Sequence, residues 1–167
     1  KNMKRRIDLE VEKVDKDHHD HFLNGAIFKV KDLNNGQITY LASGQLLIKG
    51  NGVNEEYEIS KDENFENIVK VAKTDNFKEI ILDIDDGVYY SRKINDDKVT
   101  KHIIKDGKAI LPDAIYGHSY EFNEIKAPTS YHKADKSMTY TVIANKDTDT
   151  VIFKFENKRI ELPNTGI

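Results

Sequence analysis

Residues 7–14 read IDLEVEKV, and their alternation of apolar and charged side chains decides the fold class. Side chains alternate across a β-strand, so Ile7, Leu9 and Val11 share one face. Lys13 lies on that same face, and the acidic residues between them share the other. A period of two predicts a half-buried strand, and here the core face of the strand ends in a lysine.

The rest of the chain repeats this pattern in short runs separated by turn dipeptides such as Asn24-Gly25 and Asp106-Gly107. After 7–14, the predicted strands are residues 26–31, 38–42, 45–49, 78–84, 87–94, 98–104, 119–125, 138–144 and 150–157. Regular short strands with turns between them indicate a β-sandwich.

One stretch breaks the period of two. From Ser60 to Lys73, apolar residues recur at helical spacing, at Phe65, Ile68, Val69 and Ala72. Ser60 followed by Glu63 has the spacing of a capping box. The pattern predicts a single amphipathic helix on a β scaffold, with its apolar stripe packed on the core.

Composition excludes several classes of protein. The 167 residues carry a net charge of −3, which argues against a nucleic-acid partner. Cysteine is absent, so neither a disulfide nor a thioester can form. No apolar run approaches the length of a membrane span. The cluster His18-His19-Asp20-His21 lacks partner ligands, and we expect no metal and no cofactor.

Two further strands also end an apolar row in a polar residue. Tyr120 and Phe122 share a face with Glu124, and the row of Val151, Phe153 and Phe155 leads to Asn157. Burying an unpaired neutral polar group costs roughly 2–7 kcal/mol, and a charge costs more. Lys13, Glu124 and Asn157 are therefore expected to lie together.

These three residue types suggest a reaction. Desolvation lowers the pKa of a lysine and raises that of a glutamate, which favours a neutral amine beside a protonated carboxyl. The amine can attack the Asn157 carboxamide carbon while the carboxyl polarises the carbonyl and transfers protons. Simpler interpretations stay open: Lys13 reaches water at a strand end, Asn157 caps a turn, and Glu124 forms an ordinary salt bridge with Lys13.

The chain ends in a motif that resembles the sorting signal cut by sortases on Gram-positive cell surfaces. The motif is Leu-Pro-x-Thr-Gly, here Leu162, Pro163, Asn164, Thr165 and Gly166. The resemblance implies cleavage after Thr165 and its attachment to peptidoglycan or to a neighbouring pilin subunit. It implies a secreted protein anchored to the cell wall, at the extracellular surface, with sortase as a partner.

Three segments resemble a CnaB-type (SpaA-like, prealbumin-like) domain. They are Lys13-Val14-Asp15 followed by Leu23-Asn24-Gly25-Ala26-Ile27-Phe28, then residues 120–131 as a "Y-x-x-x-E-x-x-A-P-x-x-Y" box, and Phe155-Glu156-Asn157-Lys158. The resemblance implies an autocatalytic isopeptide bond, with Lys13 as nucleophile, Asn157 as acceptor and Glu124 as the catalytic carboxyl.

The expected architecture is an all-β, immunoglobulin-like (CnaB/prealbumin-like) sandwich with a long insertion that carries one α-helix. It comprises a single domain over residues 1–161, an insertion at about 33–117 and a sorting-signal tail over 162–167. The expected function is a tension-bearing stalk or a basal or minor pilin, with no turnover enzyme activity. The alternative is an adhesin whose insertion binds a host protein or glycan.

Overall fold

The computed structural model describes residues 6–143 and 150–161, and every regular element within them is a β-strand. The strands are β1 (Arg6–Asp15), β2 (Ile27–Asp32), β3 (Ile38–Ala42), β4 (Leu46–Lys49), β5 (Glu56–Ser60), β6 (Ile68–Lys73), β7 (Glu79–Leu82), β8 (Gly87–Lys93), β9 (Thr100–Ile104), β10 (Lys108–Ile115), β11 (Ser119–Lys126), β12 (Met138–Thr141) and β13 (Thr150–Asn157).

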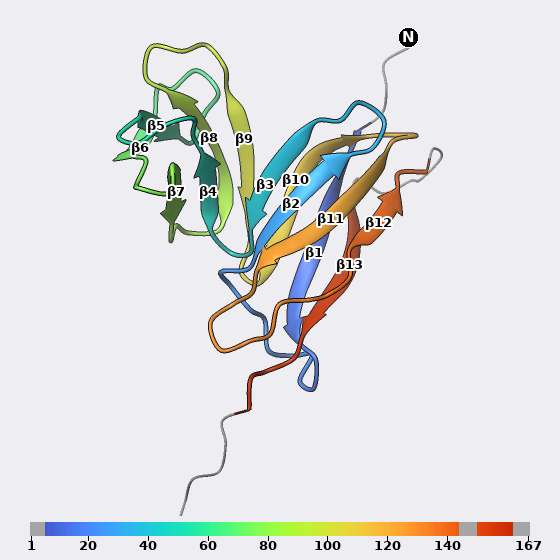
Figure 1. The fold of residues 1–167 in the computed structure, drawn as a ribbon. Helices are drawn as coiled ribbons and strands as arrows, with labels where there is room; N and C mark the ends of the chain where they lie inside the picture. The colour runs from blue at the N-terminus through green and yellow to red at the C-terminus, as the bar shows by residue number, and fades with distance from the viewer. Residues whose placement is uncertain (1–5, 144–149, 162–167) are drawn as a thin grey trace, which may run out of the picture.

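Two sheets form a β-sandwich that contains both the first and the last strand (Figure 1). One sheet has the order β10-β1-β13, and the other has the order β12-β11-β2-β3. The predicted sandwich is therefore confirmed at this level. The strands that carry Lys13 and Asn157 belong to one sheet, whereas Glu124 lies on the opposite sheet.

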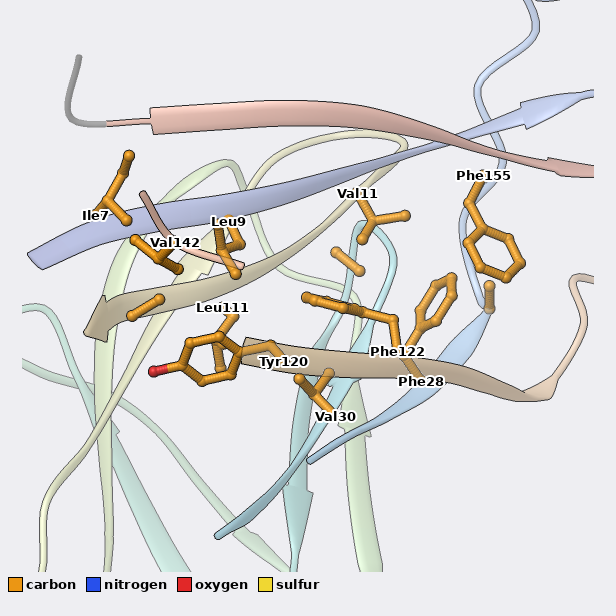
Figure 2. Packing of buried hydrophobic residues seen from close by; sticks show 13 residues of the cluster. Ile7, Leu9, Val11, Phe28, Val30, Leu111, Tyr120, Phe122, Val142 and Phe155 are labelled. Carbon is orange, nitrogen blue, oxygen red and sulfur yellow. The ribbon is translucent and has the colours of Figure 1, made fainter. Parts of the chain in front are cut away.

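The core lies between these two sheets, and the alternation seen in the sequence positions it (Figure 2). Leu9 and Val11 of β1 are fully buried, as are Phe28 of β2 and Phe122 of β11. The Phe28 ring meets the rings of Phe122 and Phe155 edge to face, with centroids 6.4 and 5.0 Å away. Aromatic pairs prefer such edge contacts, so Phe28 joins the two sheets near the ends of β1 and β13.

The first and last strands are parallel neighbours (Figure 1). Lys13 of β1 is in register with Phe155 of β13, and Asp15 is in register with Asn157. Parallel strands cannot be joined by a tight turn, and the chain between these two builds the remainder of the molecule. Both strands consequently finish at the same end of the sandwich.

Strands β4 to β9 form a second lobe beside the sandwich (Figure 1). It consists of a two-stranded sheet, β4-β7, and a four-stranded sheet with the order β6-β5-β8-β9. These sheets enclose a separate hydrophobic cluster that includes Leu46, Ile59 and Tyr89. Strand β3 before the lobe and β10 after it belong to the sandwich, which ties the lobe to the sandwich on both sides.

The predicted helix is wrong, because the described residues contain no helix. The Asp62 carboxylate accepts hydrogen bonds from the backbone amides of Asn64, Glu66 and Asn67, which satisfies amides that a helix would need. The residues after this loop are rich in β-branched side chains, which favour a strand. They form β6, which pairs with β5 in place of a helical turn.

Strand β10 was absent from the predicted set because Pro112 and Asp113 interrupt its sequence. It lies at the edge of its sheet, where a proline is tolerated. The register with β1 shifts between Ile7 and Leu9, and the Asp8 side chain accepts the Asp113 amide at 3.0 Å. This irregularity lets the chain pass the proline and continue as a strand.

The tight turn before β10 fixes the backbone of β1 at Lys13. The Gly107 carbonyl accepts the Lys13 amide at 2.8 Å, and the Gly107 amide donates to Asn24 Oδ1 at 2.6 Å. Gly107 has a φ of +69°, and a Cβ there would lie 2.3 Å from Phe22 Cβ. Only glycine combines this backbone conformation with such a close approach.

We predict that Gly107→Ala destabilises the fold by more than Gly36→Ala, measured by denaturant unfolding. Gly36 has a similar φ of +77° but open space around its missing Cβ. Gly36→Ala should therefore cost only the left-handed backbone strain, about 1–2 kcal/mol. The clash with Phe22 should add about 1–3 kcal/mol at Gly107. Equal losses would show that the turn relaxes away from Phe22.

Candidate functional site

The three residues selected from the sequence converge inside one end of the sandwich. Lys13 comes from β1, Asn157 from β13 and Glu124 from β11 on the facing sheet. Their exposed fractions are 0%, 1% and 5%, respectively. Each ends an apolar row that points into the core, so strand alternation carries all three into the same buried space.

Lys13 lies in an aromatic pocket. Its Nζ lies 5.6 Å from the centroid of the Phe28 ring and 4.6 Å from that of Phe155, and it donates to the Phe155 carbonyl at 2.9 Å. Burial lowers the pKa of the Lys13 ammonium from 10.5 to about 8, although the Glu124 carboxylate beside it opposes the shift. The amine thus loses its proton far more readily than a surface lysine.

Glu124 bridges the other two residues through its two oxygens. Oε2 lies 3.1 Å from Lys13 Nζ, and Oε1 accepts a hydrogen bond from Asn157 Nδ2 at 2.6 Å. Oε1 also accepts the backbone amide of Ala134 at 2.9 Å. One carboxyl group therefore contacts both nitrogen atoms of the site, one with each oxygen.

The Asn157 carboxamide is held by its nitrogen. Nδ2 donates both to Glu124 and to the His132 carbonyl, the latter at 2.8 Å. Oδ1 is buried and has no hydrogen-bond partner in the part of the chain that the structure describes. Leaving such a group unpaired costs about 1–3 kcal/mol, and an orphaned buried acceptor requires an explanation.

These contacts decide among the simpler interpretations. The interpretation in which Lys13 reaches water is wrong, because its side chain has no exposed surface. Asn157 does not cap an exposed turn with its side chain, which points to Glu124 and His132. The salt bridge between Lys13 and Glu124 is present, but it is fully buried. A buried ion pair loses much of its attraction to the cost of desolvation, so stability alone is a weak reason for it.

The sequence did not reveal the backbone groups of the segment between β11 and β12. The His132 carbonyl and the Ala134 amide both act on the site, yet any residue type could supply them. The available signal was Ala127-Pro128, since a proline ends a strand and obliges the chain to turn there. This segment also borders a groove of about 930 Å³ that is lined on its other wall by residues 154–158 of β13 and the chain after it.

Other features singled out from the sequence lie apart from this site. The rings of His18 and His21 are 5.2 Å apart, and His19 pairs with Glu156. No group of three or more potential metal ligands occurs among the described residues. Within those same residues, no helix could serve as a membrane span. The sorting-signal residues Leu162, Pro163, Asn164, Thr165 and Gly166 lie outside the described ranges.

Sequence comparison leaves the family open, because no family model and no curated protein matches the chain. Solved structures do match it. The backbone protein of pilus 2b from group B streptococcus is 18% identical, with a TM-score of 0.44, and the match covers 93% of this chain and 42% of that one.

Two further structures give similar values. A minor pilin of Streptococcus agalactiae is 20% identical over 99% of this chain and 49% of its own, with a TM-score of 0.46. The shaft pilin SpaA of Lactobacillus rhamnosus GG is 15% identical over 95% of this chain and 50% of its own, with a TM-score of 0.45. This chain thus spans half or less of the length of these structures, all of which are pilins of Gram-positive bacteria.

Proposed function

We propose that this chain is a CnaB-like, tension-bearing domain of a wall-anchored stalk or of a basal or minor pilin. An intramolecular isopeptide bond between Lys13 and Asn157 closes it covalently. The observation that carries the proposal is the buried contact of one carboxyl, Glu124, with both Lys13 Nζ and Asn157 Nδ2. In this proposal residues 1–161 form the domain, and residues 162–167 form the sortase tail. The insertion expected at about 33–117 corresponds to the lobe of β4 to β9, because β3 and β10 at its two ends belong to the sandwich.

The reaction needs only the groups that meet at the site. A proton moves from the Lys13 ammonium to Glu124, which leaves a neutral amine beside a protonated carboxyl. Nζ attacks Cγ of Asn157 and gives a second proton to Oε2, while the carboxyl delivers one to Nδ2. The Cγ–Nδ2 bond then breaks. The products are an amide between the two side chains, one ammonia and a protonated Glu124, so atoms and charge balance.

The geometry of the site supports this reaction in three ways. Oε2 faces the attacking nitrogen and Oε1 faces the leaving nitrogen, so one carboxyl can shuttle a proton between them. Burial fixes all three groups in one place, and such proximity can supply about 7–11 kcal/mol of the barrier. The reaction also removes the buried ion pair, whose desolvation is costly. It occurs once per chain and is no turnover activity.

The topology supports a mechanical role. The cross-link would close a loop of about 145 residues, which by analogy with disulfides removes roughly 4–5 kcal/mol of unfolded-state entropy. Because β1 and β13 are parallel and the bond lies near both of their ends, tension applied across the chain would pass from β1 directly to the chain after Asn157. The two sheets and the second lobe would carry little of the load.

The partners in this proposal follow from the sorting-signal motif at residues 162–166. Sortase would cleave after Thr165 and join it to peptidoglycan or to a neighbouring pilin subunit. The domain would then stand outside the cell, anchored at its C-terminal end. The chain has no cysteine, so an amide cross-link would give an extracellular domain the stability that disulfides give to others. Unlike a disulfide, an amide bond does not respond to redox conditions.

A second candidate, an adhesin, is favoured by the surface of the second lobe. The edge strand β6 exposes Ile68, Val69 and Val71, and Phe77 in the following turn is 76% exposed. Exposed apolar side chains along an unpaired edge are suited to binding another protein. If so, Val71→Lys should abolish binding of the chain to an immobilised extracellular-matrix protein, whereas Lys13→Ala should bind as before. Equal binding by Val71→Lys would exclude this edge.

We predict that the intact mass of the folded chain is lower than its sequence mass by one ammonia. Lys13→Ala and Glu124→Ala should restore the full mass, because one lacks the nucleophile and the other lacks the proton shuttle. High-resolution mass spectrometry makes the measurement. An unmodified mass in the parent chain would refute the cross-link.

Two controls accompany that measurement. Asn-Gly pairs lose ammonia by forming succinimides, so a deficit that persists in Lys13→Ala comes from Asn24, Asn35 or Asn51. Lys108→Ala removes a lysine that pairs with Glu12 at 3.2 Å on the opposite face of β1. It should keep the full ammonia loss, which separates the Lys13 chemistry from the general effect of deleting a lysine in this region.

We also predict the pH dependence of the rate at which refolded chain loses ammonia. The reaction needs the proton that the Lys13 ammonium brings to the site, and Lys13 loses this proton as pH rises through its pKa of about 8. The rate should therefore be level near neutral pH and fall about tenfold per pH unit well above 8. A rate that instead rises through pH 8 would mean that a free amine suffices and that Glu124 passes no proton.

A further inference from the structure

Residues 130–134, which follow β11, lie over the site and form backbone hydrogen bonds with the chain just after Asn157. The backbone of this segment pairs with that stretch, since the His132 amide donates to the Lys158 carbonyl at 2.8 Å and the Ile160 amide donates to the Ser130 carbonyl at 2.9 Å. Tyr131 forms an isolated bridge with Arg159 between these bonds. The position of this segment is thus coupled to that of the chain after β13.

The same segment supplies two of the groups that orient the reacting atoms. The His132 carbonyl accepts from Asn157 Nδ2, and the Ala134 amide donates to Glu124 Oε1. These groups sit one and three residues after Tyr131. A shift of the segment would therefore turn the carboxamide and the carboxyl together.

A side-chain hydrogen bond ties this segment to β1. The Tyr131 hydroxyl donates to Asp15 Oδ2 at 2.6 Å, and Asp15 lies two residues beyond Lys13. The Asp15 side chain is held in turn, because Oδ1 accepts the backbone amides of Asp17 and His18 at 2.8 and 3.2 Å. Asp15 is buried at 2% exposure, and Tyr131 is half-buried.

We propose that Tyr131 and Asp15 form a latch that positions the Asn157 carboxamide and the Glu124 carboxyl against Lys13. The inference rests on the proposed cross-link and adds to it a pair of positioning residues. Among the described residues, no hydrogen bond or ion pair joins either side chain to Lys13 Nζ, Glu124 or Asn157, so the pair acts through the backbone of residues 132–134. The latch joins the strand of the nucleophile to the segment that holds the other two groups.

The physical reason is the sensitivity of rate to geometry. Without the hydroxyl, the segment keeps its backbone bonds to residues 158–160 but loses its fixed position relative to β1. A displacement of about 1 Å can cost 100-fold in rate, so even a smaller displacement should slow the reaction about tenfold or more. The nucleophile, the acceptor and the carboxyl remain chemically intact in such a variant.

The test is a refolding time course on the full chain. Unreacted chain is separated in denaturant, folding is started by dilution, samples are quenched in acid, and the loss of ammonia is followed by intact mass. Tyr131→Phe should form the cross-link about tenfold or more slowly than the parent and still reach completion. Tyr89→Phe removes a comparable hydrogen bond, to the Asp85 carbonyl in the second lobe, and should react at the parental rate.

A purely structural role is separated by two further measurements. Unfolding of Lys13→Ala with and without Tyr131→Phe gives the fraction of folded chain in the absence of reaction, and the rates are corrected for it. Asp15→Asn keeps the shape of the side chain and should slow the reaction. If the two residues act as one latch, the double variant Tyr131→Phe/Asp15→Asn should be no slower than the slower single variant.

The outcomes separate this inference from the proposed function. A parent chain that never loses ammonia would overturn the cross-link and the latch together. A parent that reacts while Tyr131→Phe reacts equally fast, after correction for folding, would overturn the latch alone. Slowing factors that multiply in the double variant would also overturn it, because they would show two independent effects.

Discussion

The contact between the Lys13 ammonium and the Glu124 carboxyl is the interaction on which the rest of this site depends. It joins the two sheets of the sandwich at a place where neither side chain has exposed surface, and the rings of Phe28 and Phe155 lie against the Lys13 ammonium. Burial makes both charges energetically costly and therefore favours transfer of the proton from the Lys13 ammonium to the carboxylate. Asn157 adds a carboxamide beside the same carboxyl, and its carbonyl oxygen gains no hydrogen bond from the described residues. These are the properties that the proposed reaction between Lys13 and Asn157 requires.

The order of the strands determines how the proposed cross-link would transmit force. Lys13 and Asn157 lie near the ends of two parallel neighbours, so a bond between their side chains would connect the first strand to the last without altering the sheet. In the proposed role, the intervening chain, which includes the whole second lobe, would lie outside the path of the load. The sandwich would then supply strength along its axis, while the surface of the lobe would be free to vary. The exposed apolar edge at β6 lies in the part that the load would bypass.

Precision at the site comes from elements around it as much as from the three residues themselves. The Gly107 carbonyl fixes the Lys13 backbone from one side. The segment after Pro128 fixes Asn157 and Glu124 from the other, through the His132 carbonyl and the Ala134 amide. These supports are backbone groups in turns, where position depends on φ and on tight packing rather than on side-chain chemistry. They explain why residues far apart in the chain can meet with hydrogen-bond geometry.

The sequence by itself determined which side chains face the core. Alternation along residues 7–14, 119–125 and 150–157 is a local property, and it was sufficient to place Lys13, Glu124 and Asn157 on buried faces. Periodicity gave the wrong element between Ser60 and Lys73, because a helix and a loop followed by a strand can both produce this spacing of apolar residues. The hydrogen bonds that the Asp62 side chain accepts stabilise the loop. Only the tertiary structure decided the pairing of β10 across Pro112, the backbone groups that support the site, and the contact of Tyr131 with Asp15. Those features join residues distant in the chain, and no periodicity of a single segment carries information about its partner.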